Sequence, residues 1–124
     1  MKQLFFFECV VDCPFHDRND KKYINFELND NAVIKVCRAQ ITSAPFLKTE
    51  KIMNPLDGNS LEVKIPFRYN RVSCKVHGDK IIQDLVKGDR VEVEIEYNGV
   101  WDSGDWCGFS WKLNQLNLAT RVDQ

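Results

Sequence analysis

The sequence contains no apolar run long enough to span a membrane and no large excess of charge of one sign. The aromatic cluster at residues 4–7 is followed by Glu8 and Asp12, which excludes the apolar region of a signal peptide. Its 17 basic residues nearly balance 18 acidic ones, for a net charge of -1. This balance excludes a protein that coats nucleic acid through bulk charge alone. We therefore expect a cytoplasmic protein, in a host cell if it is viral, that binds no membrane.

Closely paired cysteines are also missing. The chain has five cysteines, and no two of them form a Cys-x-x-Cys motif, which is typical of reduced thiols. Cys9, Cys13 and His16 lie close together, but a structural zinc site needs a second pair of ligands, and the other cysteines and His77 are scattered. The phosphate-binding, dinucleotide-binding and zinc-protease motifs are absent as well. We expect no metal, no cofactor and no enzymatic activity.

Alternation of apolar and polar residues is the strongest pattern that is present. Residues 91–97 alternate without a break, which predicts a strand with one buried face and one face of glutamates. Residues 61–69, 72–77 and 109–118 alternate too, and a phase slip before Leu116 predicts a bulge. Further strands are expected at 3–11, 23–28 and 32–41. These patterns predict an all-β protein.

One short segment has a helical pattern. Asp79 is a suitable N-cap, apolar residues recur at helical spacing after it, and Gly88 suits a left-handed C-terminal position. The Asn98-Gly99 pair predicts a hairpin turn. From residue 32 onward the expected order is therefore three strands, a helix and two strands, as in a five-stranded OB barrel with its helix between strands three and four. We expect one domain over residues 1–124, with an N-terminal strand extension at 1–31 and a barrel at 32–119.

Residues 77–95 contain Lys87-Gly88-Asp89-Arg90-Val91-Glu92-Val93, which resembles the K-G-D-x-V-x-V segment of single-stranded-DNA-binding OB proteins. Residues 111–113 resemble the W-[RK]-[IL] positions of the phage and viral type of this family, and residues 97–101 resemble its G-x-x-W positions, with one residue fewer between Gly99 and Trp101. The resemblance covers roughly residues 61–118. It implies a protein that binds single-stranded DNA with little sequence preference in replication, recombination or repair.

The basic residues gather in the middle of the chain. Residues 35–80 hold nine basic and four acidic side chains, a net charge of +5. Within this block, we expect cations that follow a nucleic-acid backbone at Lys35 and Arg38 on the first barrel strand, Lys48 and Lys51 in the next loop, and Lys64, Arg68, Arg71 and Lys75 on or beside the second and third strands. By alternation, Lys64 and Arg68 share one side of their strand. The alternative is a solvated charged face.

Aromatic rings for base stacking are the second requirement of a single-strand binder. Trp101 and Trp106 lie in a polar hairpin tip, where burial is difficult, and Tyr69 lies at a strand end from which its ring can swing outward. Stacking on bases and packing within the protein both remain open for these rings. Phe109 and Trp111 share a face with Leu113, and we expect them in the core.

Two other functions remain open. The chain could be a protein-interaction or structural module of a virion or replication assembly, or it could bind RNA through the same residues. A homo-oligomer is compatible with each of these functions. Single-stranded nucleic acid, with DNA favoured over RNA, is the expected partner.

Overall fold

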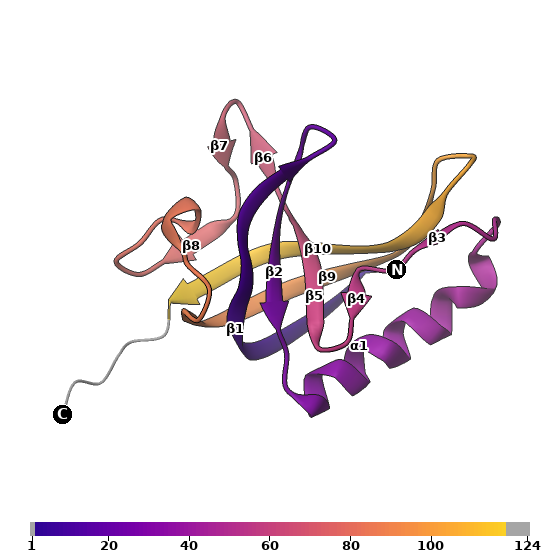
Figure 1. The fold of residues 1–124 in the computed structure, drawn as a ribbon, viewed down its shortest axis with the longest axis horizontal. Helices are drawn as coiled ribbons and strands as arrows, with labels where there is room; N and C mark the ends of the chain where they lie inside the picture. The colour runs from indigo at the N-terminus through magenta and orange to yellow at the C-terminus, as the bar shows by residue number, and fades with distance from the viewer. Residues whose placement is uncertain (1, 119–124) are drawn as a thin grey trace.

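The computed structural model describes residues 2–118 and is built mostly of strands, as the sequence predicts (Figure 1). The three helical segments are α1 (Asp30–Ser43) and the short 3₁₀ helices η1 (Ala44–Phe46) and η2 (Ile82–Asp84). The strands are β1 (Gln3–Arg18), β2 (Lys21–Glu27), β3 (Ile52–Met53), β4 (Leu56–Asp57), β5 (Ser60–Ile65), β6 (Phe67–Arg68), β7 (Arg71–Val72), β8 (Lys75–His77), β9 (Arg90–Asp102) and β10 (Cys107–Leu118). No helix among the described residues is long and apolar enough to cross a membrane.

The five longest strands form a strongly curled sheet whose pairings close into a ring. In order around the ring, β1 pairs with β2, β2 with β5, β5 with β10, β10 with β9, and β9 with β1. The β5–β10 pairing is parallel, and the other four are antiparallel. Of the short strands, β3 and β8 pair with β10 and β4 pairs with β5, while β6 and β7 form a separate hairpin. Within the expected N-terminal strand extension, β1 and β2 supply two neighbouring strands of this ring.

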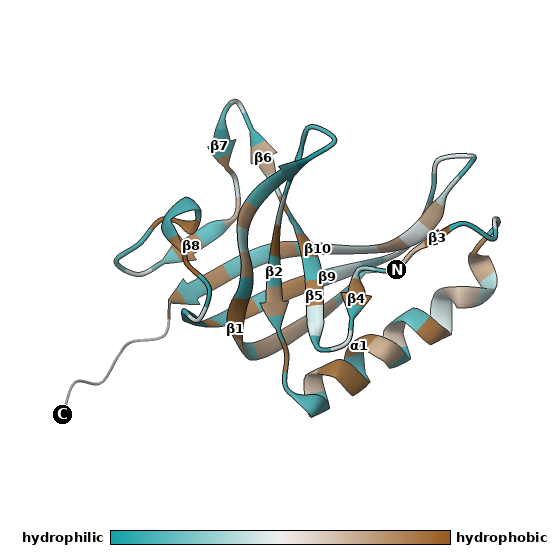
Figure 2. Cartoon of the chain, in the orientation of Figure 1, coloured by the Kyte–Doolittle hydropathy of each residue, from teal (hydrophilic) through white to brown (hydrophobic). Residues whose placement is uncertain are grey.

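Alternation determines which side chains enter the core. Val91, Val93 and Ile95 of β9 are buried, as are Leu61, Val63 and Ile65 of β5 and Leu113 of β10. The interposed residues face outward, so the predicted two-faced strands are confirmed at these positions. In Figure 2 the tips of the β1–β2 and β6–β7 hairpins are hydrophilic, which leaves the apolar core in the body of the sheet.

The strand predicted at 32–41 is wrong, because these residues belong to α1. The Asn29 side chain caps this helix by accepting a hydrogen bond from the Ala32 backbone N–H at 2.8 Å. The buried residues of α1 are Ala32, Val36, Ala39 and Gln40. Their spacing follows the period of a helix, and it prevails over the strand preference of the β-branched residues in the segment. The principal helix therefore precedes β5 rather than following it.

The helix predicted at 79–88 is wrong as well, because only η2 forms there. Ile82 and Leu85 are buried, while Ile81 and Val86 are exposed, so only one apolar pair packs inward. The following backbone bonds to β1 instead of continuing a helix: the Gly88 N–H donates to Val11 O, and the Val11 N–H donates to Asp89 O, each at 2.9 Å. Gly88 has the expected positive φ, of 99°.

The Asn98-Gly99 pair forms a bulge and not the predicted hairpin turn. Gly99 pairs with Ser110, and Tyr97 pairs with Trp111, so Asn98 is the additional residue in β9. Gly99 has a φ of 91°, which favours glycine at this irregular position. β9 consequently continues to Asp102. The predicted slip in the last strand is confirmed as a second bulge between Leu113 and Gln115.

The strand predicted over 61–69 is divided at Pro66. β5 ends at Ile65, and β6 turns away to pair with β7 around Tyr69 and Asn70, whose φ values are 53° and 61°. Proline has no N–H to donate to a neighbouring strand, so a break at this position follows from its chemistry. Arg68 therefore does not share a strand face with Lys64.

Candidate functional site

A groove of about 870 Å³ lies outside β2 and β5, between two hairpin tips. The tip of the β1–β2 hairpin, around Asn19, forms one end of the groove, and the β9–β10 loop, around Ser103 and Trp106, forms the other. The charged and aromatic side chains that line it are Arg18, Lys21, Tyr23, Glu62, Lys64, Trp101, Asp102, Trp106, Phe109 and Trp111.

Lysines from two neighbouring strands give the groove its positive charge. Lys21 and Tyr23 lie on the outward face of β2, opposite the buried Ile24, and Tyr23 pairs in register with Lys64 of β5. Partial burial and the nearby charges of Lys21 and Lys112 lower the pKa of Lys64. Burial and the neighbouring positive charges both disfavour the charged form of Lys64, and an anion bound here would favour it.

Two side chains of β1 lie near the Tyr23 ring. The Arg18 guanidinium lies 4.7 Å from the centroid of the Tyr23 ring, and the His16 ring stacks near it with a centroid separation of 6.1 Å. Such contacts hold an aromatic ring in a fixed orientation. Tyr23 is therefore a positioned ring on the wall of the groove.

The two tryptophans at the other end of the groove differ in how tightly they pack against the protein. The Trp101 indole packs against Gly108, because a Cβ atom at Gly108 would lie 2.9 Å from Trp101 Nε1 and 2.5 Å from Met53 O. Trp106 is 44% exposed, and the Lys51 ammonium lies 5.8 Å from its ring centroid. Trp101 is a fixed wall, while Trp106 offers an open ring face beside a cation.

The two carboxylates in the groove already have partners. Arg18 Nη2 lies 2.7 Å from Glu62 Oε1, and His16 Nε2 lies 3.5 Å from Glu62 Oε2. Asp102 Oδ1 accepts a hydrogen bond from the Gly104 backbone N–H at 2.8 Å, which turns the carboxylate into its own loop. These contacts offset part of the negative charge that a phosphate would encounter. Among residues 2–118, no cluster of three or more His, Cys, Asp or Glu side chains could hold a metal ion.

A buried polar contact supports the floor of the groove. Trp111 Nε1 donates a hydrogen bond to Gln40 Oε1 at 3.0 Å, and Gln40 Nε2 donates to Asn54 Oδ1 at 3.1 Å. Both Gln40 and Trp111 are buried, so each of these groups needs its partner. Helix α1 thereby fixes both β10 and the segment that enters β4, and both of these line the groove.

Of the ten residues predicted to bind nucleic acid, the groove contains Lys64, Trp101 and Trp106. Lys51, also expected near this surface, contacts the Trp106 ring. The structure therefore brings together residues from distant parts of the sequence through the ring of strand pairings.

The other seven predicted residues lie outside the groove lining. Lys35 and Arg38 are on α1 instead of a barrel strand, and Lys48 is in the loop before β3. Tyr69 is 94% exposed at the β6–β7 turn, between Arg68 and Arg71, and Lys75 is on β8, which pairs with the far end of β10. The basic block of the sequence is therefore distributed over several surfaces.

The sequence analysis missed Arg18, Lys21, Tyr23 and Phe109 as lining residues. The alternation of Lys21, Tyr23 and Asn25 with the apolar Ile24 and Phe26 is a signal for an outward face. The missing information was the pairing of β2 with β5, which joins this face to Lys64.

Cationic side chains beside exposed ring faces can hold an extended ligand that carries negative charges and planar groups. Comparisons of the chain with protein-family models, curated proteins and solved structures found no match.

Proposed function

We propose that this protein binds single-stranded DNA in the groove outside β2 and β5, with little sequence preference. The observation that supports this proposal most is the presence of Arg18, Lys21 and Lys64 in one groove with Tyr23, Trp101 and Trp106. Phosphates require a cationic track, and unstacked bases require ring faces, each worth about 1–3 kcal/mol.

We also propose that the fold is an OB barrel. The ring β1-β2-β5-β10-β9 has five strands, and one parallel pairing joins its third and fifth strands in chain order. OB folds bind oligonucleotides on the face of their second and third strands, between the loops that follow the first and fourth strands. In this chain the corresponding elements are β2 and β5 with residues 19–20 and 103–106, and the groove lies among them. The position of α1 departs from the usual OB arrangement.

The charge distribution supports an extended, single-stranded ligand. Lys21 lies beside the β1–β2 tip, Lys64 lies on β5 and Lys51 lies near Trp106, so positive charge is present at both ends of the groove and between them. A strand with exposed bases could place its phosphates along these lysines and its bases against the rings. No base-specific set of donors and acceptors is needed for this mode of binding.

A titration of the protein with fluorescein-labelled oligo-dT, followed by fluorescence anisotropy, tests this proposal. We expect binding at low salt that weakens steeply as salt is added, because neutralised phosphates release their counterions. Quenching of tryptophan emission should accompany binding. An anisotropy that does not change at low salt would overturn the proposal and favour a protein-interaction module. Competition with oligo-U distinguishes RNA from DNA, and stronger competition by oligo-U than by oligo-dT would reassign the ligand as RNA.

A further inference from the structure

The side of the ring opposite the groove carries exposed apolar residues in an acidic setting. β9 lies across the ring from β2 and β5, since β1 and β10 are its two neighbours. We define the β9 face as the outward residues of this region: Leu4, Phe6 and Glu8 of β1, Glu92 and Glu94 of β9, and Gln115 and Asn117 of β10.

Phe6 is the unusual residue of the β9 face. It is 70% exposed, whereas its neighbour Phe7 is 6% exposed and belongs to the core. Leu4, two residues earlier on the same face, is 53% exposed. Exposed aromatic and aliphatic side chains that lie side by side commonly mark interaction sites. Within residues 2–118, no other element covers them.

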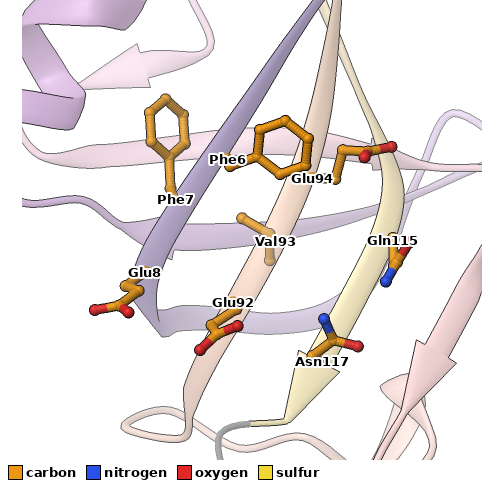
Figure 3. A pocket seen from close by; sticks show the side chains of 8 residues that line it. All are labelled: Phe6, Phe7, Glu8, Glu92, Val93, Glu94, Gln115 and Asn117. Carbon is orange, nitrogen blue, oxygen red and sulfur yellow. The ribbon is translucent and has the colours of Figure 1, made fainter.

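A hollow of about 360 Å³ lies beside Phe6 (Figure 3). Its rim is polar and acidic, with Glu8, Glu92 and Glu94 around it, together with Gln115 and Asn117. In the strand register, Phe6 pairs with Glu94, and Glu8 pairs with Glu92. A hollow of this size accommodates one large apolar side chain, with the carboxylates positioned around it.

The carboxylates around this hollow are available to a partner. No described residue forms an ion pair with Glu8, Glu92 or Glu94, and Glu94 only accepts a hydrogen bond from Asn114 Nδ2 at 3.4 Å. Glu96, farther along β9, is already near Lys2, with Lys2 Nζ and Glu96 Oε1 4.0 Å apart. The negative charge therefore concentrates beside Phe6.

We propose that the β9 face binds an extended basic segment of a protein partner, in which lysines or arginines flank a large apolar side chain. The carboxylates match the basic residues, while Phe6 and the hollow match the apolar one. The same carboxylates repel nucleic acid and anionic lipid. Because the groove is on the opposite side of the ring, partner and nucleic acid could bind together, and this inference does not depend on what the groove binds.

A fluorescein-labelled peptide of alternating lysine and leucine is the probe for this site. We expect it to bind more tightly than a lysine–serine peptide of the same length, and we expect a glutamate–leucine peptide not to bind. Equal affinity for the lysine–leucine and lysine–serine peptides would overturn the proposal, because Phe6 and the hollow would then contribute nothing.

Two variants locate the contact. Phe6→Ser and the double variant Glu92→Gln/Glu94→Gln should each weaken peptide binding about fivefold or more. The matched control is Glu27→Gln/Glu50→Gln, which makes the same change in net charge at exposed positions on β2 and in the loop before β3. If both double variants lose the same affinity for the peptide, the effect comes from net charge alone, and the proposal is overturned.

Absence of any peptide binding would also overturn it. A second copy of the chain is the other possible occupant of this face. Analytical ultracentrifugation of the unmodified protein tests for it, because it measures whether the protein is a monomer or a dimer. A dimer that Phe6→Ser converts to a monomer would assign the face to self-association instead of a basic partner. Unchanged thermal unfolding of Phe6→Ser is expected, because the ring is exposed.

Discussion

Tyr23 and Lys64 lie directly opposite each other on β2 and β5, and both side chains line the same groove. An aromatic ring can stack on a base while a neighbouring ammonium group contacts the phosphate. The two residues are far apart in the sequence, and the register of two antiparallel strands brings them together.

Replacing Lys64 with alanine should weaken oligo-dT binding and reduce the slope of log affinity against log salt by about 1, because one phosphate contact is lost. Lys35→Ala is the matched control. It removes the same charge from an exposed position on α1 that does not line the groove. Anisotropy titrations over a salt series measure both slopes. Equal effects of the two substitutions would show that only net charge matters.

Replacing Trp106 with alanine should cost about 1–3 kcal/mol of binding, because its exposed ring can stack on a base. The free energy of unfolding should hardly change, since the ring is 44% exposed in a loop. Trp106→Phe retains a ring and should restore most of the affinity. If Trp106→Ala binds oligo-dT as tightly as the unmodified protein, this ring has no role in stacking.

Replacing Gln40 with alanine should lower the free energy of unfolding by about 1–3 kcal/mol, because the buried Trp111 Nε1 loses its acceptor. Urea denaturation measures this change. Gln83→Ala is the control, at an exposed position in η2. A loss no larger than that of the control would mean that the Gln40–Trp111 contact contributes nothing to stability.

Binding should also depend on pH through Lys64. Burial and the charges of Lys21 and Lys112 lower the pKa of Lys64, so it loses its proton at a lower pH than an ordinary lysine. A phosphate needs the protonated form, and affinity should therefore fall as the pH rises through this lowered pKa.

The arginine in a Lys64→Arg variant stays protonated over this range, so the variant should retain its affinity at alkaline pH. Oligo-dT titrations from neutral to alkaline pH compare the two proteins. Parallel pH profiles would contradict a role for the Lys64 charge in binding.

Local patterns predicted the individual strands better than their arrangement. Alternation identified β9 and β10 and even the bulge near Leu116, because burial of one face leaves a period of two in the sequence. The segment at 32–41 was predicted as a strand because β-branched residues favour strands. It forms a helix because Asn29 caps it and because Ala32, Val36 and Ala39 recur at helical spacing.

The residues that line the groove were harder to predict than the elements of the sheet. Cations and rings were expected, and Lys64, Trp101 and Trp106 do meet in one groove. Arg68 was expected on the same surface as Lys64 but lies outside the groove, because β5 ends before Pro66. Lys21 and Tyr23 were not expected there and line the groove because β2 pairs with β5. Pairing between distant strands is not encoded in any single window of sequence, so the neighbours of a side chain could not be predicted.

The measurement that tests the central claim most directly is a map of amide and indole NMR shifts as unlabelled oligo-dT is added to the ¹⁵N-labelled protein. The groove proposal predicts that the largest changes occur at residues 18–23, 62–64 and 101–109, with the indole signals of Trp101 and Trp106 among them. Changes confined to the β6–β7 hairpin, to α1 or to the β9 face would contradict it.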